Sequence, residues 1–134
     1  MAQENVDTVR RANEALKRGD REAALADYHP DAVWHDLAHA PDSAERVHGL
    51  PALRAIWDQW EQAFDELSAD IEEFIDAGRY VVAMTRWRAR GKGSGVVIDV
   101  YQADVFQVDG GKVTSVTLGY PDKRTALNAV GLAE

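Results

Sequence analysis

The sequence predicts an α+β fold in which a curved antiparallel sheet wraps around a three-helix layer and a short helix closes the chain. Two observations carry this prediction. Apolar residues recur at helical spacing in the first half of the chain, whereas from residue 68 onward they alternate with a period of two. Short glycine-containing turns separate the alternating segments, which is typical of consecutive antiparallel strands. Helices followed by a strand meander favour an α+β layer arrangement.

The first two helices are predicted over residues 5–18 and 21–28. The buried face of the first helix is expected to consist of Val6, Val9, Asn13 and Leu16. Gly19 stands where a helix ends, and Asp20 is a suitable N-cap for the next helix. Pro30 then stops the second helix.

A short strand over residues 32–37 and a polar loop over residues 39–50 follow. A third helix is predicted to begin at Pro51, because proline is favoured in the first helical turn. Its apolar stripe consists of Leu53, Ile56, Trp57, Trp60, Phe64 and Leu67. Such a stripe belongs to the core, or forms one wall of an apolar pocket if the sheet curves away from it.

Four long strands are predicted for residues 69–76, 80–90, 96–108 and 112–120. Asp122 is placed to cap a last helix, and Gly131 is placed to end it. The sequence contains no internal repeat and no linker, so we expect one domain over residues 1–134.

The composition argues against several functional classes. A formal net charge of −8 disfavours a nucleic-acid surface, which needs clustered positive charge. The absence of cysteine excludes disulfides, thiolate metal sites and a cysteine nucleophile. The polar, acidic N-terminus differs from a signal peptide, and no apolar run approaches the ~20 residues that span a bilayer. We therefore expect a cytoplasmic protein that does not bind membranes.

No cofactor is expected from the motifs. Residues 91–95 are glycine-rich like a phosphate-binding loop, but strands are predicted on both sides, whereas such a loop needs a helix after it. The segment therefore predicts a hairpin turn.

Two carboxylates are candidates for proton transfer. Trp34 and Asp36 share one face of the first strand, so Asp36 either serves as an acid beside an aromatic ring or merely ends the strand by bonding backbone amides. Asp104 shares a face with Gln102 and Phe106 on a later strand. If that face is buried, Asp104 must be paired, hydrogen-bonded or neutral; the alternative is an exposed aspartate on a two-sided sheet.

Two further groups of polar residues stand out in the sequence, one of histidines and aspartates and one of arginines. Histidines and aspartates gather between residues 29 and 48, but their spacing lacks the helix that a histidine metal motif requires, so no metal is expected; they are His29, Asp31, His35, Asp36, His39, Asp42 and His48. Arg86, Arg88 and Arg90 share one face of a strand. A solvated or dimer-facing stripe is favoured there over an anchor for an acidic substrate.

Several short segments together resemble the SnoaL-like branch of the nuclear transport factor 2-like superfamily. They are residues 5–12, 18–20, 29–36, 74–78, 109–113 and 120–127. The resemblance implies a cone-shaped α+β barrel with a pocket between the third helix and the curved sheet. Its members include ketosteroid isomerases, polyketide cyclases, epoxide hydrolases, dehydratases and non-enzymes.

The resemblance to the isomerases implies that Asp36 is the general base and that Asp104 is a protonated oxyanion donor. The isomerases' oxyanion tyrosine falls at Ala12 or Asn13 here, and the cyclases' acid falls near Leu118, so neither group is present. The epoxide hydrolases' arginine–aspartate relay has no clear counterpart.

Three functional hypotheses follow. The first is a cofactor-independent isomerase, cyclase or hydrolase that transfers protons on a small apolar carbonyl or cyclic compound, with Tyr28 or His48 assisting. The second is a non-catalytic binder of a hydrophobic metabolite, and the third is an interaction module with a filled pocket. The expected pocket residues are Tyr28, Trp34, His48, Trp57, Trp60, Phe64, Gln102, Phe106, Val116, Leu118 and Tyr120.

A homodimer is also expected by resemblance, through the outer face of the sheet. The apolar patch expected there consists of Val97, Tyr101, Ala103 and Val105.

Overall fold

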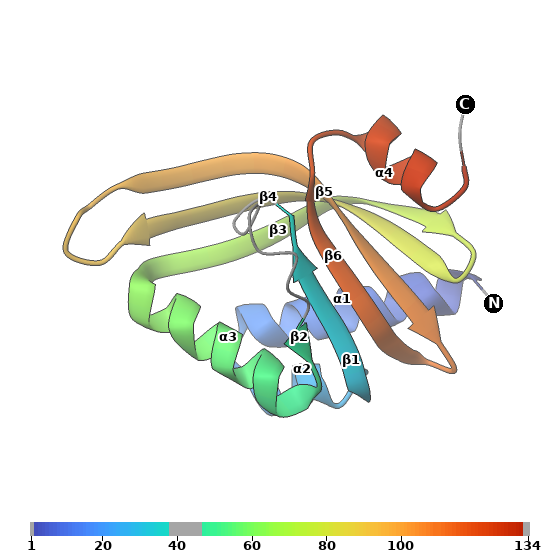
Figure 1. Cartoon of the computed structure of the whole chain (residues 1–134), viewed down its shortest axis with the longest axis horizontal. Coiled ribbons are helices and arrows are strands. Elements are labelled where there is room, and N and C mark those ends of the chain that lie inside the picture. Colours follow the sequence, from blue (N-terminus) through green and yellow to red (C-terminus); the bar gives the residue numbers. More distant parts are fainter. Residues whose placement is uncertain (1, 38–46, 133–134) are drawn as a thin grey trace.

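The computed structural model describes residues 2–37 and 47–132. Figure 1 shows a curved sheet with α1, α2 and α3 on one side and α4 on the other. The helices are α1 (Ala2–Lys17), α2 (Arg21–Leu25), α3 (Leu50–Ala63) and α4 (Lys123–Ala129). The strands are β1 (Tyr28–Asp36), β2 (Val47–His48), β3 (Phe64–Ala77), β4 (Tyr80–Gly91), β5 (Val97–Asp109) and β6 (Lys112–Tyr120). The predicted α+β class is confirmed.

The six strands lie in the order β2-β1-β6-β5-β4-β3. Strands β3 to β6 form the predicted meander, in which each strand pairs antiparallel with the next. The expectation of a wholly antiparallel sheet is wrong at one place, because β1 pairs parallel with β6. The chain between these two strands includes α3 and the meander, and a connection of this length permits parallel pairing.

The helix ends follow the sequence signals in part. The Asp20 side chain accepts a hydrogen bond from the amide of Ala23 at 3.1 Å, and Asp122 caps α4 through Thr125 at 2.8 Å, as predicted. Helix α2 ends at Leu25, before the predicted residue 28, because β1 begins at Tyr28. The polar loop prediction over residues 39–50 is wrong at Val47–His48, which pair with β1; residues 38–46 lie outside the described part.

The third helix is shorter than predicted. It ends at Ala63, and Phe64 takes an extended conformation that opens β3 and pairs with Gly91. Leu67 also lies in β3, beside a register shift between Asp65 and Ser68 where Glu66 has a positive φ of 56°. Phe64 and Leu67 are three residues apart in the sequence, which mimics a helical stripe, and the bulge between them allows both to line the same cavity.

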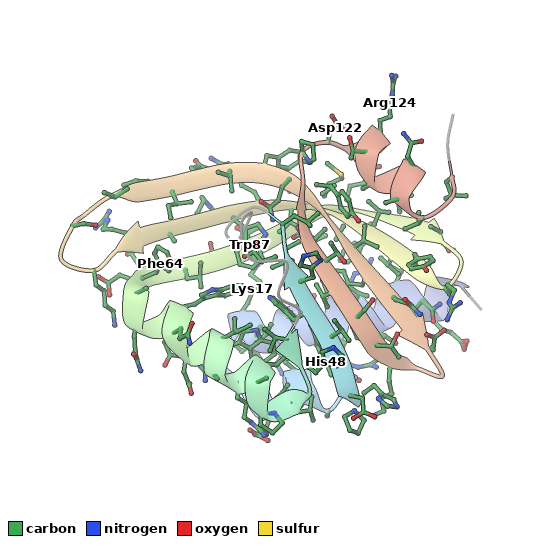
Figure 2. The ribbon with its side chains drawn as sticks, in the orientation of Figure 1. Lys17, His48, Phe64, Trp87, Asp122 and Arg124 are labelled. Carbon is green, nitrogen blue, oxygen red and sulfur yellow. The ribbon has the colours of Figure 1, made fainter. Side chains whose placement is uncertain are left out.

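Two apolar clusters lie on opposite faces of the sheet. The larger cluster joins α1, α2 and α3 to the concave face and includes Val9, Leu53 and Trp57. The smaller cluster packs Ala126 of α4 against Ala103 and Val105 of β5 on the other face. In Figure 2, Asp122 and Arg124 lie on the α4 side of the sheet, whereas Lys17 and His48 lie on the opposite side.

Helix α4 changes the expected dimer patch. Ala103 and Val105 are buried beneath it, so they do not belong to an exposed surface, while Val97 and Tyr101 stay exposed. No helix within residues 2–37 and 47–132 combines the length and apolarity needed to cross a bilayer.

Candidate functional site

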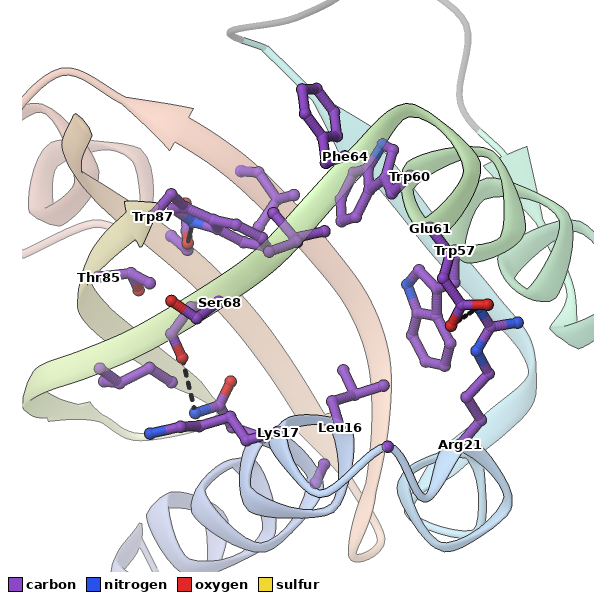
Figure 3. Close-up of a pocket in the computed structure, with 18 of the residues that line it drawn as sticks. Leu16, Lys17, Arg21, Trp57, Trp60, Glu61, Phe64, Ser68, Thr85 and Trp87 are labelled. Carbon is purple, nitrogen blue, oxygen red and sulfur yellow. Dashed lines mark hydrogen bonds and ion pairs between the residues drawn. The ribbon is translucent and has the colours of Figure 1, made fainter. Parts of the chain in front are cut away.

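A cavity of about 330 Å³ lies between α1, α3 and the concave face of the sheet. Figure 3 shows Leu16 of α1, Trp57 of α3 and Trp87 of β4 around this space. The curvature of the sheet holds β4 and β5 away from α3, so the side chains do not fill the space between them. The volume falls at the lower end of the range for small-molecule pockets.

Aromatic rings form much of the lining. All four tryptophans of the chain, Trp34, Trp57, Trp60 and Trp87, line the cavity. Trp34 packs edge-to-face on Trp57 at 6.0 Å and on Trp60 at 5.8 Å, and Trp60 contacts Trp87 at 5.6 Å between ring centroids. These contacts, from strands β1 and β4 and helix α3, fix each ring against its neighbours.

Asp104 provides the buried carboxylate of the cavity, whereas Glu61 and Glu66 of the lining are exposed. Asp104 is 1% exposed, so its face of β5 is buried from Gln102 to Phe106, whereas Val100 on the same face is 39% exposed. Three neutral donors contact it: Trp87 Nε1 donates to Oδ2 at 3.0 Å, and Gln102 Nε2 and the Gly119 amide donate to Oδ1 at 2.8 and 3.0 Å. The carboxyl is thus hydrogen-bonded without a described cationic partner.

A bulge in the sheet makes the Gly119 contact. The register between β5 and β6 shifts between the pairs Ala103–Tyr120 and Val105–Thr117, so two residues of β6 stand opposite Asp104. Gly119 has a φ of 98°, a conformation that glycine adopts readily. Its amide thereby leaves the regular ladder and donates to the Asp104 side chain.

Burial raises the pKa of Asp104 to about 6, while hydrogen bonds from Trp87, Gln102, Gly119 and Thr85 oppose the shift. Above pH 6 the group is therefore mostly a carboxylate, and below pH 6 mostly an acid. A carboxyl that titrates near neutrality is suited to both accepting and donating a proton.

Tyr28 contributes a second buried polar group to the cavity wall. Its ring packs edge-to-face on Trp57 at 6.1 Å. Burial, with a smaller contribution from Asp27, raises the pKa of Tyr28 above its usual value. The phenol therefore stays protonated throughout the physiological range.

The second predicted acid, Asp36, does not line the main cavity. It lines a smaller hollow of about 50 Å³ with Gln102, at the end of β1 where it pairs with Leu118 of β6. The two hollows share lining residues, namely Trp60, Phe64, Leu67, Trp87 and Leu118. The structure thus places the two acids in adjoining spaces. Gln102 connects them, because it lines the smaller hollow with Asp36 and donates a hydrogen bond to Asp104 of the main cavity.

The two basic residues of the main cavity lie in ion pairs. Lys17 contacts Asp70 at 2.6 Å, and Arg88 contacts the same carboxylate at 2.6 Å, which lowers the pKa of Asp70. Arg21 pairs with Asp58 and, at 3.0 Å, with Glu61. Figure 3 shows Arg21 and Glu61 together at one side of the space, with Lys17 on another.

One buried donor has no acceptor among the described residues. Trp34 is 4% exposed, and its Nε1 is the one buried side-chain nitrogen or oxygen without a hydrogen-bond partner in that part of the chain. An unpaired buried N–H is unfavourable, so this ring is held by packing against Trp57 and Trp60.

Most of the expected pocket residues line the main cavity: Tyr28, Trp34, Trp57, Trp60, Phe64, Phe106 and Leu118. Gln102 lines the smaller hollow. Three others line neither space: His48 is exposed on β2, Val116 is fully buried in the core, and Tyr120 packs toward α4. Val116 shares the face of Leu118 but lies beyond the cavity, whereas the register shift opposite Asp104 turns Tyr120 to the α4 face.

Several residues that line the cavity were missed in the sequence, among them Leu16, Lys17, Ser68 and Ile71. Trp87 and Thr85 line the cavity from β4, on the face opposite Arg86 and Arg88. Alternation along that strand was the available signal, because the residues between the arginines must face inward. Arg86 forms a two-armed ion pair with Asp99 at 2.8 and 2.9 Å, as expected of a solvated stripe.

No three histidine, aspartate or glutamate side chains within residues 2–37 and 47–132 are grouped so as to hold a metal ion. His39 and Asp42 of the predicted cluster lie outside the described residues.

Comparison with known proteins relates this geometry to a family. The family model of the SnoaL-like domain matches residues 9–116. No curated protein sequence matches the chain.

Solved structures match nearly the whole chain. An NTF2-like protein of unknown function from Burkholderia pseudomallei is 21% identical with a TM-score of 0.78, covering 96% of this chain and 98% of that chain. TerC, co-crystallised with polyporic acid, is 16% identical with a TM-score of 0.77, covering 95% and 97%. A Catenulispora acidiphila protein with a ketosteroid isomerase-like fold, in complex with trimethylamine, is 18% identical with a TM-score of 0.72, covering 93% and 92%. These similarities show a common fold.

Proposed function

Because the chain belongs to the family of SnoaL-like domains, we propose that its cavity binds a small, largely apolar molecule and that Asp104 transfers a proton on it. The observation that carries this proposal is a buried carboxyl with a pKa of about 6 at the wall of an apolar cavity. The neighbours with polyporic acid and trimethylamine support small-molecule binding in this fold.

The proposed role of Asp104 differs from the one that the resemblance implied. With a pKa of about 6, the group is mostly ionised at pH 7, and three N–H donors stabilise the carboxylate. Asp104 therefore acts as the proton acceptor in this proposal. Asp36 remains a proposed second acid, which meets a substrate only if the substrate extends into the smaller hollow.

Exchange of protons for deuterons at the α-carbon of cyclohexanone in D₂O tests this chemistry without knowledge of the natural substrate. Asp104 takes the α-proton to leave an enolate, which then takes a deuteron at carbon. We expect the protein to accelerate exchange, measured by NMR, and Asp104→Asn to lose about 10²-fold of the acceleration. Asp36→Asn is the matched comparison and is expected to lose less.

Equal exchange rates for wild type and Asp104→Asn would contradict the catalytic proposal. Saturable quenching of tryptophan fluorescence by cyclohexanone without accelerated exchange would favour the non-catalytic binder instead. Loss of quenching as well would favour the interaction module, although an open cavity of about 330 Å³ argues against a filled pocket.

We also propose that two copies associate through the outer face of the sheet. Val97 is 68% exposed and Tyr101 is 52% exposed on β5, and large exposed apolar side chains of this kind often mark an interface. Light scattering at micromolar concentration is expected to report a dimer, and Tyr101→Asp is expected to shift it toward monomer. A wild-type monomer would contradict this assembly.

A further inference from the structure

We propose that the molecule bound in the cavity is a compact organic cation, an alkylated ammonium whose charge lies among the tryptophans and near Asp104. The inference rests on the small-molecule binding proposed above and names the class of ligand. Three independent features of the cavity lead to it: an uncompensated carboxylate, a lining of indole rings, and an apolar remainder.

The first feature is the electrostatic imbalance around Asp104. Its described hydrogen-bond partners are neutral groups, and none of them carries a positive charge; they are Trp87, Gln102, Gly119 and Thr85. Buried carboxylates are normally paired with a cation, bound to a metal or neutralised. A ligand cation supplies the missing charge, and it favours the ionised form that accepts a proton.

The two cations that line the cavity are already engaged. Lys17 is paired with Asp70, and Arg21 is paired with Asp58 and Glu61. Each is thus neutralised by at least one carboxylate before a ligand arrives. An anionic ligand would be repelled by the Asp104 carboxylate, and neither basic residue of the described lining is unpaired to compensate for that repulsion. The cavity therefore disfavours anions.

The second feature is the arrangement of the indole rings. Trp34 and Trp57 are inclined at 78°, and Trp60 and Trp87 at 84°. Rings that meet at steep angles form walls around a common space, and Figure 3 shows Trp57, Trp60 and Trp87 on different sides of it. The face of an indole carries negative electrostatic potential and attracts cations more strongly than other aromatic rings do.

The third feature selects an alkylated over a primary ammonium. A primary ammonium has three N–H donors that need acceptors once it leaves water. The lining offers mainly apolar surface, for example Leu16, Ile71 and Leu118, and the oxygens of Asp104 already accept three hydrogen bonds. Alkyl groups on the nitrogen pack against this surface and remove most of the N–H groups.

A pair of isosteric probes isolates the charge. Choline and 3,3-dimethylbutan-1-ol have nearly the same shape, but only choline is positively charged. Calorimetric titration of the wild-type protein at pH 7.5 is expected to show choline binding at least tenfold more tightly, a difference of about 1.4 kcal/mol. Equal affinities for the two probes, or tighter binding of the alcohol, would overturn the assignment.

Variants then locate the charge preference. In Asp104→Asn the new amide faces the Trp87 N–H, donor against donor. The double variant Trp87→Phe with Asp104→Asn removes that conflict, and Trp87→Phe alone is its control. We expect the double variant to bind choline at least tenfold more weakly than Trp87→Phe does. Its affinity for the alcohol is expected to differ from that of Trp87→Phe by less than twofold.

Trp60→Leu keeps an apolar side chain but removes one aromatic face. It is therefore expected to lower the affinity for choline several-fold more than the affinity for the alcohol. Equal weakening of both probes would mean that the cavity selects shape alone, which contradicts the inference.

The outcomes separate this inference from the function on which it rests. If cyclohexanone undergoes Asp104-dependent exchange while choline binds no better than the alcohol, the cation assignment fails and the proton-transfer proposal stands. If choline binds with the predicted selectivity and no exchange occurs, the ligand class stands and the catalytic proposal fails. If neither probe nor ketone binds, both fail.

Discussion

Trp87 and Asp104 come from the neighbouring strands β4 and β5, and the indole N–H of Trp87 donates to Asp104 Oδ2 at 3.0 Å. The same indole lines the cavity and packs edge-to-face on Trp60, with 5.6 Å between the ring centroids. One side chain therefore belongs to both the aromatic lining and the hydrogen-bond shell of the buried carboxylate. The charge state of the acid and the shape of the cavity are coupled through it.

Replacing Trp87 is expected to destabilise the protein more than replacing Trp34, although Trp34 is the more buried of the two. Trp87→Phe leaves a buried carboxylate oxygen without its donor, which costs about 1–3 kcal/mol beyond the lost ring volume. Trp34→Phe removes an N–H that has no acceptor among the described residues. Urea denaturation at pH 7.5 measures both, and a larger loss for Trp34→Phe would contradict this assignment of the hydrogen bonds.

The stability contributed by Asp104 is expected to fall as pH rises from about 4 to about 6. Its pKa is about 6 in the folded protein against an ordinary value of 3.8, so between these values the folded state binds more protons than the unfolded state. Stability then decreases with rising pH, by an amount of order 3 kcal/mol.

Comparison of two variants isolates this effect, because other charged groups contribute equally to both. Trp87→Phe is expected to lose stability between pH 4.5 and 7, whereas Trp87→Phe with Asp104→Asn is expected to lose less. Both variants keep the other charged residues that line the cavity, namely Lys17, Arg21, Glu61 and Glu66. Carboxylates with a lowered pKa, such as Asp70, act in the opposite sense, since their stabilisation is lost as pH falls. Identical pH profiles for the two variants would contradict a raised pKa.

Gly119→Ala is expected to destabilise the fold by about 1–2 kcal/mol, because a residue with Cβ is strained at its φ of 98°. Gly78→Ala is a matched control, with a φ of 74° and no atom within 4 Å of the added Cβ. Both variants carry backbone strain, but only Gly119→Ala is expected to shift the titration of Asp104, through its amide contact. NMR titration of the Asp104 carboxyl distinguishes them; an equal shift in both would contradict the role given to the bulge.

Ser68→Leu is expected to fill part of the cavity and to weaken ligand binding at least tenfold while leaving the fold intact. Ser68 lies on β3 at the cavity wall, where Figure 3 shows it between Trp87 and Lys17. Ser68→Ala is the control and is expected to bind choline and cyclohexanone like the wild type. Tryptophan fluorescence reports both titrations, because all four tryptophans line this space. Unchanged binding by Ser68→Leu would place the ligand elsewhere.

The strand meander and the helix caps could be predicted because their signals are local. Alternation gave β6 its bounds, and a side-chain acceptor marks the start of α4 at Asp122. The end of α3 could not be predicted in this way, since Phe64 and Leu67 keep a helical spacing across a strand bulge. The parallel pairing of β1 with β6 depends on contacts far apart in the chain, and no local pattern encodes it.

The site shows the same division. Alternation along β5 placed Asp104 on its face, and burial then followed from the fold. Its donors come from three different positions, and one of them, the Gly119 amide, is available only because of a register shift between strands. Sequence alone also could not tell whether Asp36 and Asp104 share one space, because that depends on how Trp60 and Phe64 divide the concave face.

The pKa of Asp104 tests the central claim most directly, because the proposed chemistry requires a buried carboxyl that titrates near neutrality. Carbon-13 NMR of the side-chain carboxyl, assigned by comparison with Asp104→Asn, measures it in the intact protein. A midpoint near 6 is predicted for the free protein. An ordinary midpoint near 4 would mean that the group is solvated, and would contradict its role as the proton-transfer residue of the cavity.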